Sequence, residues 1–233
     1  MKIIISFLND FLSLIYPRLC MACGKSLLNH EHNICTFCQY HLPRTNFHHE
    51  KENPISKLFW GKIMIETAAS YFYFQKKGKV QRLMHQLKYK GQKEVGIYIG
   101  QLYGKELNTS KLYNTVEYII PVPLHPNKEK KRGYNQSEMF AHGLAESMNI
   151  TVDTSTLIRI TATETQTKKS RFNRWENVKE VFKINNSEHL KNKHVLLVDD
   201  VITTGSTIES CVLKLQQIEG IRISVVSIAF AYN

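Results

Sequence analysis

The chain has 233 residues, enough for one good-sized core and a small appendage, and its 42% hydrophobic and 22% charged residues are typical of a soluble globular protein. No apolar run in the sequence approaches the ~20 residues that span a bilayer, which excludes a membrane-spanning protein and favours a cytoplasmic one. The net charge of +11 arises from 31 basic against 20 acidic residues. A solvated basic face explains it most simply; basic loops around a phosphorylated ligand or a groove for single-stranded nucleic acid are the functional alternatives.

The first 17 residues form an amphipathic stretch. Its apolar positions between Ile4 and Ile15 fit one face of a helix that Pro17 would end. Asn9 and Asp10 interrupt the apolar run, and no small-residue cleavage site follows, which argues against a signal peptide. We therefore predict a packing helix, with a helix lying on a membrane surface as the alternative.

Two C-x2-C pairs, separated by eleven residues, contain four of the five cysteines. Each pair can form a tight knuckle, and four converging thiolates complete a tetrahedral structural zinc site with no open position for a substrate. Two disulfides are the alternative, but nothing suggests secretion, and disulfides are rare in the cytosol. We predict a zinc ribbon that stabilises the fold, contacts nucleic acid or docks a protein. The predicted ligands are Cys20, Cys23, Cys35 and Cys38.

A polar segment that begins near Asn46 and contains Pro54 is predicted to be a linker. It divides the chain into an N-terminal helix and ribbon at residues 1–45, a linker at 46–66 and an α/β domain at 67–233.

The domain begins with alternating strand and helix patterns. We predict a strand over Ala68–Phe74, helices over Val80–Tyr89 and Val95–Leu107, a strand over Glu117–Val122 and a helix from Ser137 to about Met148. The second strand leads into P-V-P-L-H-P, a shaped loop in which a cis peptide is possible.

After this loop comes a basic run that ends in R-G-Y-N-Q at the start of a helix. Lys131 and Arg132 belong to this run. A prolyl loop, a basic run and a helix start favour a corner that binds anions, whereas a solvated basic turn is the simpler explanation.

The segment between Thr161 and Val178 is polar and basic and follows a brief apolar run at Leu157–Ile160. We interpret it as a lid over a charged ligand, with an ordinary surface loop as the alternative. Its candidate ligand-binding residues are Gln166, Arg171 and Arg174. Strands are predicted at Val181–Ile184 and at Ile223–Phe230, the latter closing the sheet.

The sequence H-V-L-L-V-D-D-V-I-T-T-G-S-T, from His194 to Thr207, carries the most chemical information. Val195–Val198 predicts a buried strand that ends on two adjacent carboxylates, Asp199 and Asp200, and a helical pattern follows the threonine-rich turn. The glycine lets the backbone fold tightly, so that N–H groups and hydroxyls point at one phosphate near the positive end of the helix dipole. A helix cap with ordinary turn threonines is the structural alternative. The predicted phosphate-binding residues are Thr203, Thr204, Gly205, Ser206 and Thr207.

This stretch resembles the phosphoribosyl-pyrophosphate (PRPP) motif of type I phosphoribosyltransferases. The resemblance implies that Asp199 and Asp200 hold the ribose 2′- and 3′-hydroxyls and that the turn holds the 5′-phosphate. It also implies that the loop with Lys131 and Arg132 holds pyrophosphate, with Mg²⁺ bridging pyrophosphate and ribose.

The four-cysteine ribbon, P-V-P-L-H-P, R-G-Y-N-Q, a T-x-x-x-Q…R-x-x-R-x-x-N spacing and the D-D…T-T-G-S-T turn together resemble the ComF family. Thr167 stands where that spacing more usually has leucine. The resemblance covers nearly the whole chain. It implies an α/β fold of the type I phosphoribosyltransferase kind, in which a parallel sheet is flanked by helices and preceded by a zinc ribbon. It also implies a cytoplasmic role in natural competence, in the uptake or processing of single-stranded DNA.

Two function classes remain open. The first is a transferase that uses PRPP on an unidentified acceptor, and the second is a non-catalytic module that binds single-stranded DNA and recombination or helicase proteins. Purine-salvage members of the superfamily carry an acidic residue where this chain has Thr203 and a base-covering segment beyond the last strand. We therefore expect no turnover of hypoxanthine, guanine or adenine.

Overall fold

The computed structural model describes residues 17–160 and 181–231. Within these ranges five parallel strands form one sheet in the order β1-β7-β6-β2-β3. Parallel strands joined by helices are the arrangement that the alternating sequence patterns predict, and the parallel α/β fold class is confirmed. The strands are β1 Ala68–Tyr73, β2 Tyr118–Pro121, β3 Thr151–Val152, β6 His194–Ile202 and β7 Arg222–Phe230.

The two central strands, β6 and β7, are almost continuously apolar. All of Ile223–Phe230 in β7 and the first five residues of β6 are buried. Strands with helices on both faces show such continuous runs, whereas strands with one solvent face alternate between apolar and polar residues. The sheet therefore lies inside the domain.

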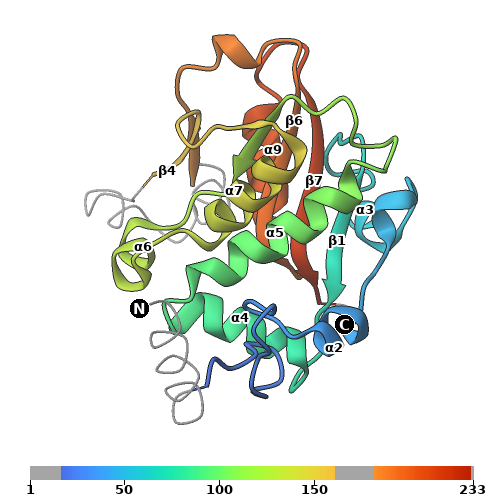
Figure 1. The fold of residues 1–233 in the computed structure, drawn as a ribbon. Coiled ribbons are helices and arrows are strands. Elements are labelled where there is room, and N and C mark those ends of the chain that lie inside the picture. Colours follow the sequence, from blue (N-terminus) through green and yellow to red (C-terminus); the bar gives the residue numbers. More distant parts are fainter. Residues whose placement is uncertain (1–16, 161–180, 232–233) are drawn as a thin grey trace.

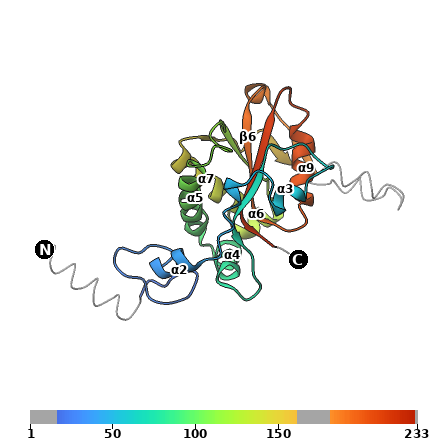
Figure 2. The ribbon, with the colours of Figure 1, turned by 90° about the vertical axis from the view of Figure 1, so that its right-hand side faces the viewer.

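Helices cover both faces of the sheet. Figure 2 shows α5 and α7 on one face and α3 and α9 on the other. In Figure 1, α4 and α6 lie at the end of the sheet where the strand arrows end. The helices are α3 Pro54–Lys57, α4 Lys79–Tyr89, α5 Lys93–Leu107, α6 Pro126–Arg132, α7 Gln136–Met148 and α9 Ser206–Leu215.

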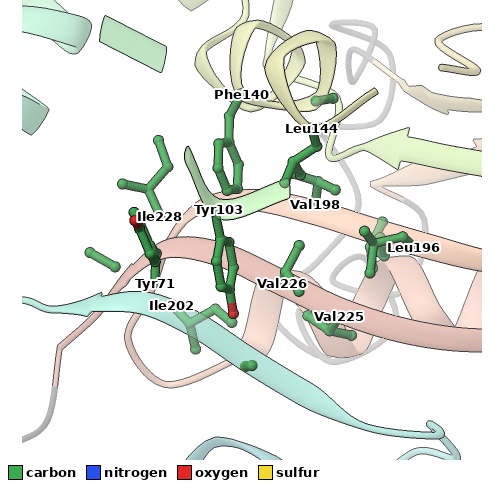
Figure 3. Packing of buried hydrophobic residues seen from close by; sticks show 14 of the residues in the cluster. Tyr71, Tyr103, Phe140, Leu144, Leu196, Val198, Ile202, Val225, Val226 and Ile228 are labelled. Carbon is green, nitrogen blue, oxygen red and sulfur yellow. The ribbon is translucent and has the colours of Figure 1, made fainter. Parts of the chain in front are cut away.

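Glycines let α5 and α7 approach each other closely. A Cβ atom at Gly143 of α7 would collide with the carbonyl oxygen of Ile97, and one at Gly100 would collide with that of Phe140. Aromatic rings fill the space toward the sheet, with Tyr103 between the ring of Tyr71 at 4.6 Å and that of Phe140 at 6.4 Å (Figure 3).

The ribbon containing α2, Thr36–His41, packs against α4 and α5 (Figure 2). Lys79 Nζ lies 4.9 Å from the centroid of the Phe37 ring, and Gln39 donates a hydrogen bond to the Tyr98 hydroxyl. The ribbon is thus attached to the two helices that follow β1.

Residues 46–66, predicted to be a linker, form the short helices η1 Phe47–His49 and α3 and run beside β1. Asn53 is buried, caps α3 and donates a hydrogen bond of 2.7 Å to the carbonyl oxygen of Ala68. Phe59 is fully buried. Polar residues there satisfy buried backbone groups, so this segment is packed rather than a solvated tether; the division into domains stays a prediction.

Two predicted strand placements are wrong. β7 lies between β1 and β6, so it is a central strand and does not close the sheet. β6 continues to Ile202, so the strand passes through both aspartates instead of ending on them. Asp199 pairs with Ser227 of β7, and Val201 pairs with Ala229. The strand predicted at 181–184 exists as β5 Phe182–Ile184. It pairs with β4 Leu157–Arg159, which lies in the brief apolar run at 157–160, in a separate antiparallel pair.

The basic run predicted as a loop is helix α6, whose first residue is Pro126 and whose end is capped by Gly133. A proline at the first helical position and a glycine after the last explain this helix. The described residues contain no cis peptide bond, so that expectation for the prolyl loop is wrong. In the same ranges no helix is long and apolar enough to cross a membrane.

Candidate functional site

The threonine-rich turn lies at the carboxyl end of β6 and leads into α9. Gly205 is the N-cap of α9 with φ 81°, a conformation that favours glycine. The side chains of Thr203, Thr204, Ser206 and Thr207 are exposed, and the hydroxyls of Thr204 and Ser206 lie 3.2 Å apart. The ten-residue helix adds its positive end to a cluster of hydroxyls, which is a suitable place for a phosphate.

The packed segment before β1 supports this turn from behind. A Cβ atom at Gly205 would lie 2.6 Å from the ring of Phe59, and Lys62 pairs with Glu209 of α9 at 2.8 Å. Phe59 therefore fixes the position of the turn, a role that the sequence analysis did not assign because Phe59 lies within the predicted linker.

The two aspartates of β6 lie in different surroundings. Asp199 accepts hydrogen bonds from the Ser137 hydroxyl at 3.0 Å and from the Asp200 N–H at 2.7 Å. Burial and the neighbouring charge of Asp200 nevertheless raise the pKa of Asp199 to about 7. Asp200 forms an ion pair with Lys88 of α4 at 2.9 Å. A carboxyl that is protonated or shares a proton, beside an ionised carboxylate, suits the recognition of sugar hydroxyls.

The residues of the R-G-Y-N-Q motif position α4 and α7 around the two aspartates. Asn135 caps α7 and donates to the carbonyl oxygen of Val122 at 3.0 Å, which brings Ser137 to Asp199. The Tyr134 hydroxyl donates to the carbonyl oxygen of Leu87 at 2.5 Å, next to Lys88. Through these hydrogen bonds the motif connects α4, α7 and the loop after β2.

A basic pocket of about 510 Å³ opens between the end of α4 and α6. Arg132 stands 5.6 Å from the centroid of the exposed Tyr89 ring and hydrogen-bonds Gln136. Lys131 and Arg132 were predicted for this site; Lys88, Lys90 and Lys128 were not, although the basic run from Lys88 to Lys93 was a signal. The pocket is lined by Lys88, Tyr89, Lys90, Gly91, Lys128, Lys131 and Arg132.

The four predicted zinc cysteines come together. Their sulfur atoms all lie within 4.8 Å of one another, and Cys23 Sγ is 3.8 Å from Cys35 Sγ. Zinc–sulfur bonds of about 2.3 Å in a tetrahedron require sulfur atoms about 3.8 Å apart, and none of these cysteines is in a disulfide. The cluster is compatible with structural zinc.

Backbone N–H groups point at the first thiol of this cluster. Burial alone would raise the pKa of Cys20, but N–H groups of Cys35, Cys23 and Ala22 lower it to about 7; that of Cys35 lies 3.3 Å from the sulfur. Burial raises the pKa of Cys38. The N–H groups stabilise a thiolate, the form that binds zinc.

Of the remaining predicted residues, one lies in the part of the chain that the structure describes and three lie outside it. Cys211 is a buried thiol in α9, as predicted. Gln166, Arg171 and Arg174 lie outside the described residues, so their assignment to a lid stays a prediction.

Comparison with protein families gives a match to the phosphoribosyl transferase domain over residues 135–231. That match begins at Asn135, which caps α7, and includes the strand β6 with its two aspartates and the phosphate-type turn. It covers the part of the chain in which the acids, the turn and α9 lie.

The curated relatives are named for DNA utilization or for competence. The chain is 28% identical over 211 residues to the DNA utilization protein YhgH of Escherichia coli O157:H7, covering 84% of this chain and 89% of that protein. The Salmonella typhimurium protein of the same name is 32% identical over 129 residues, and there the match spans only 56% of the relative's length. Competence protein F of Haemophilus influenzae is 39% identical over 93 residues, 40% of this chain and 41% of that protein.

Proposed function

We propose that this chain binds PRPP with Mg²⁺ at the carboxyl end of β6. The premise is its match to the phosphoribosyl transferase domain over residues 135–231 and its similarity to Competence protein F and the DNA utilization protein YhgH. The observation that carries the proposal is the juxtaposition of a hydroxyl-rich turn, two strand carboxylates and a basic pocket. Lys88 connects them, because it pairs with Asp200 and lines the pocket.

Each part of the ligand has a matching group. The turn from Thr203 to Thr207 takes the 5′-phosphate, and Asp199 and Asp200 take the ribose hydroxyls. Lys131 and Arg132 in the basic pocket take the pyrophosphate. Guanidinium and ammonium donors suit the diphosphate because charge-assisted hydrogen bonds are stronger than neutral ones.

The donor set also fits Mg²⁺. This ion favours oxygen ligands and is usually held by one or two carboxylates, with phosphate oxygens and water completing its shell. Both carboxylate oxygens of Asp200 accept from the ammonium group of Lys88. When bound, the metal would neutralise charge on the leaving pyrophosphate.

The chemistry that such a site supports is displacement at the anomeric carbon. A lone pair of the acceptor forms a bond to C1′ while the C1′–O bond breaks, and the bonding pair leaves with pyrophosphate; the acceptor's proton passes to water. Asp199 and Asp200 hold the sugar and stabilise its developing positive charge.

The test separates the two halves of the ligand. Calorimetric titration with ribose 5-phosphate should show binding that Thr204→Val with Ser206→Ala weakens, while titration with pyrophosphate should show binding that Lys131→Ala with Arg132→Ala weakens. Each double substitution should change the affinity for the other ligand by no more than about twofold, because the two binding sites are separate. Equal loss of both ligands in either pair would contradict the assignment.

A second function is favoured by the exposed Tyr89, 66% accessible, among five basic side chains, and by the relatives' names. We propose that this face also contacts single-stranded DNA, for which basic grooves with aromatic rings are suited, in complexes with recombination or helicase proteins. Fluorescence anisotropy of a labelled oligo(dT) tests this: Tyr89→Ala should weaken binding about tenfold, with a steep salt dependence. An affinity that does not depend on salt, or that Tyr89→Ala leaves unchanged, would contradict this proposal.

The ribbon is proposed to bind one zinc ion as a structural element of the unit at residues 1–45, next to a phosphoribosyltransferase-like domain at 67–233. The contact of Phe37 in α2 with Lys79, the first residue of α4, supports a role in holding the ribbon against the domain.

A further inference from the structure

The ammonium group of Lys88 occupies the hydrogen-bonding positions of the Asp200 carboxylate. It lies 2.9 Å from Oδ1 and 2.9 Å from Oδ2, and the two side chains are only 22% and 15% exposed. A pair of neighbouring sugar hydroxyls binds a carboxylate by donating one O–H to each oxygen, so it needs the same positions. The ammonium group of Lys88 and the ribose hydroxyls therefore compete for Asp200.

Lys88 is also one of five basic side chains that line the basic pocket. In the described ranges none of the residues lining this pocket is acidic. Like charges repel strongly at short separations, so before an anion binds, Lys88 is more stable beside Asp200 than among the other four cations. Those four are Lys90, Lys128, Lys131 and Arg132.

The Lys88 side chain can reach both places without movement of its helix. It lines the basic pocket and also a second pocket, of about 370 Å³, that contains Asp200 and Thr203. The preceding residue, Leu87, is fully buried, and its carbonyl oxygen accepts a hydrogen bond from the Tyr134 hydroxyl. The backbone of α4 is thus anchored there, while the flexible four-carbon stem of a lysine lets its charge change position.

We propose that Lys88 couples the binding of the two halves of the ligand. It neutralises Asp200 before the ligand binds, and it moves to the diphosphate when ribose hydroxyls take its place on Asp200. Each half of the ligand then strengthens the binding of the other half, because a coupling free energy is reciprocal. This inference rests on the proposed function. It makes Lys88 a specificity-determining residue that favours intact PRPP over free pyrophosphate.

The sign of the coupling identifies its cause. A sugar phosphate and pyrophosphate are both anions, so their charges repel, and each should weaken the binding of the other when nothing mediates between them. An increase in affinity requires a cation that one ligand releases and the other takes up. Lys88 meets this requirement, because it pairs with Asp200 and lines the basic pocket.

The experiment titrates the full-length, zinc-loaded protein with pyrophosphate by calorimetry, with and without a saturating sugar phosphate. The sugar phosphate is 1,4-anhydroribitol 5-phosphate, which lacks the C1 hydroxyl of ribose 5-phosphate and so leaves room for pyrophosphate. No divalent metal is added, because a metal ion would itself neutralise Asp200. Lys88→Met removes the charge and keeps the apolar stem. Lys90→Met is the matched control, because Lys90 lines the same pocket but the partner of Asp200 is Lys88.

We expect the sugar phosphate to tighten pyrophosphate binding by the unmodified protein about fivefold, at the low end of typical couplings because the ion pair is partly exposed. Lys90→Met should keep this increase, and Lys88→Met should abolish it. Asp200→Asn gives an independent measurement. It releases Lys88, so pyrophosphate alone should bind about fivefold more tightly, and the same substitution in the Lys88→Met background should give no such gain.

Two results would overturn the coupling while both ligands still bind on their own. One is a pyrophosphate affinity that agrees within about twofold with and without the sugar phosphate. The other is an increase in affinity that survives Lys88→Met. Absence of binding of either ligand alone would instead overturn the proposed function.

Discussion

The ammonium group of Lys88 lies 2.9 Å from both carboxylate oxygens of Asp200, although the two residues are 112 positions apart. Lys88 is on the helix that follows β1, and Asp200 is near the end of β6. Their side chains are 22% and 15% exposed, respectively. Lys88 of this ion pair also lines the basic pocket, so one side chain connects the acidic and basic parts of the site.

Removing this lysine should weaken the binding of pyrophosphate. Lys88→Met keeps the apolar stem and deletes the charge that lines the basic pocket. We expect about a tenfold loss in pyrophosphate affinity, the effect of one charge-assisted hydrogen bond. Calorimetry checks this, with Lys111→Met, an exposed lysine that does not line the pocket, as the control. Equal affinity in both variants would show that Lys88 only neutralises Asp200.

The carboxyl of Asp199 should make the protein less stable as the pH rises. Its pKa is raised to about 7 in the folded protein, from an ordinary value of 3.8, by burial and by the charge of Asp200. Between these two values the folded state binds more protons than the unfolded state, so the free energy of unfolding falls with increasing pH.

Asp199→Asn removes this titration. Relative to the variant, the unmodified protein should lose on the order of 1–3 kcal/mol between pH 4 and 8, allowing for partial exposure. Urea unfolding at both pH values measures the difference. A difference between the two proteins that does not change with pH would refute the assignment.

The turn should tolerate no side chain at Gly205. Gly205→Ala places a methyl group against Phe59 and forces φ 81° on an alanine. We expect a loss of about 2–4 kcal/mol in the free energy of unfolding, from backbone strain and overpacking together, and a lower affinity for ribose 5-phosphate.

The matched control for that change is Gly91→Ala. Gly91 also has a positive φ of 70°, but nothing lies within 4 Å of an added Cβ atom. This variant should lose only about 1–2 kcal/mol in the free energy of unfolding, which is the cost of the backbone strain. Chemical denaturation of both variants separates the two costs, and equal losses would mean that contact with Phe59 is unimportant.

Zinc removal should destabilise the ribbon. The protein is expected to contain one zinc ion per chain by elemental analysis, and Cys20→Ser or chelation should release it and lower the Tm by about 5–10 °C. Cys211→Ser, which changes a buried thiol far from the cluster in sequence, should retain the zinc. Retention of metal by Cys20→Ser would contradict the four-cysteine site.

Features written in short stretches of sequence were predicted well. The spacing of the two C-x2-C pairs predicts the four-thiol cluster, and an apolar run followed by a glycine-containing turn predicts β6 and the start of α9. The helices α4, α5 and α7 begin and end within two residues of the predicted ranges. In these places the local pattern and the fold agree.

What the sequence did not predict depends on contacts between distant segments. The central position of β7 results from pairing with β1 and β6, and nothing in its own residues specifies its neighbours. Lys88 and Ser137 looked like ordinary surface and cap residues until the fold brought them to the aspartates. Phe59 supports Gly205 across 146 positions of sequence, from a segment whose polar residues are used in buried hydrogen bonds.

The measurement that tests the central claim most directly is calorimetric titration of the zinc-loaded protein with PRPP and Mg²⁺, beside the variant that carries both Asp199→Asn and Asp200→Asn. Binding to the unmodified protein should be lost in the variant, while circular dichroism and thermal unfolding show that the variant is folded. PRPP affinity that is unchanged in the folded variant, or absent from the unmodified protein, would contradict a sugar-phosphate site at the carboxyl end of β6.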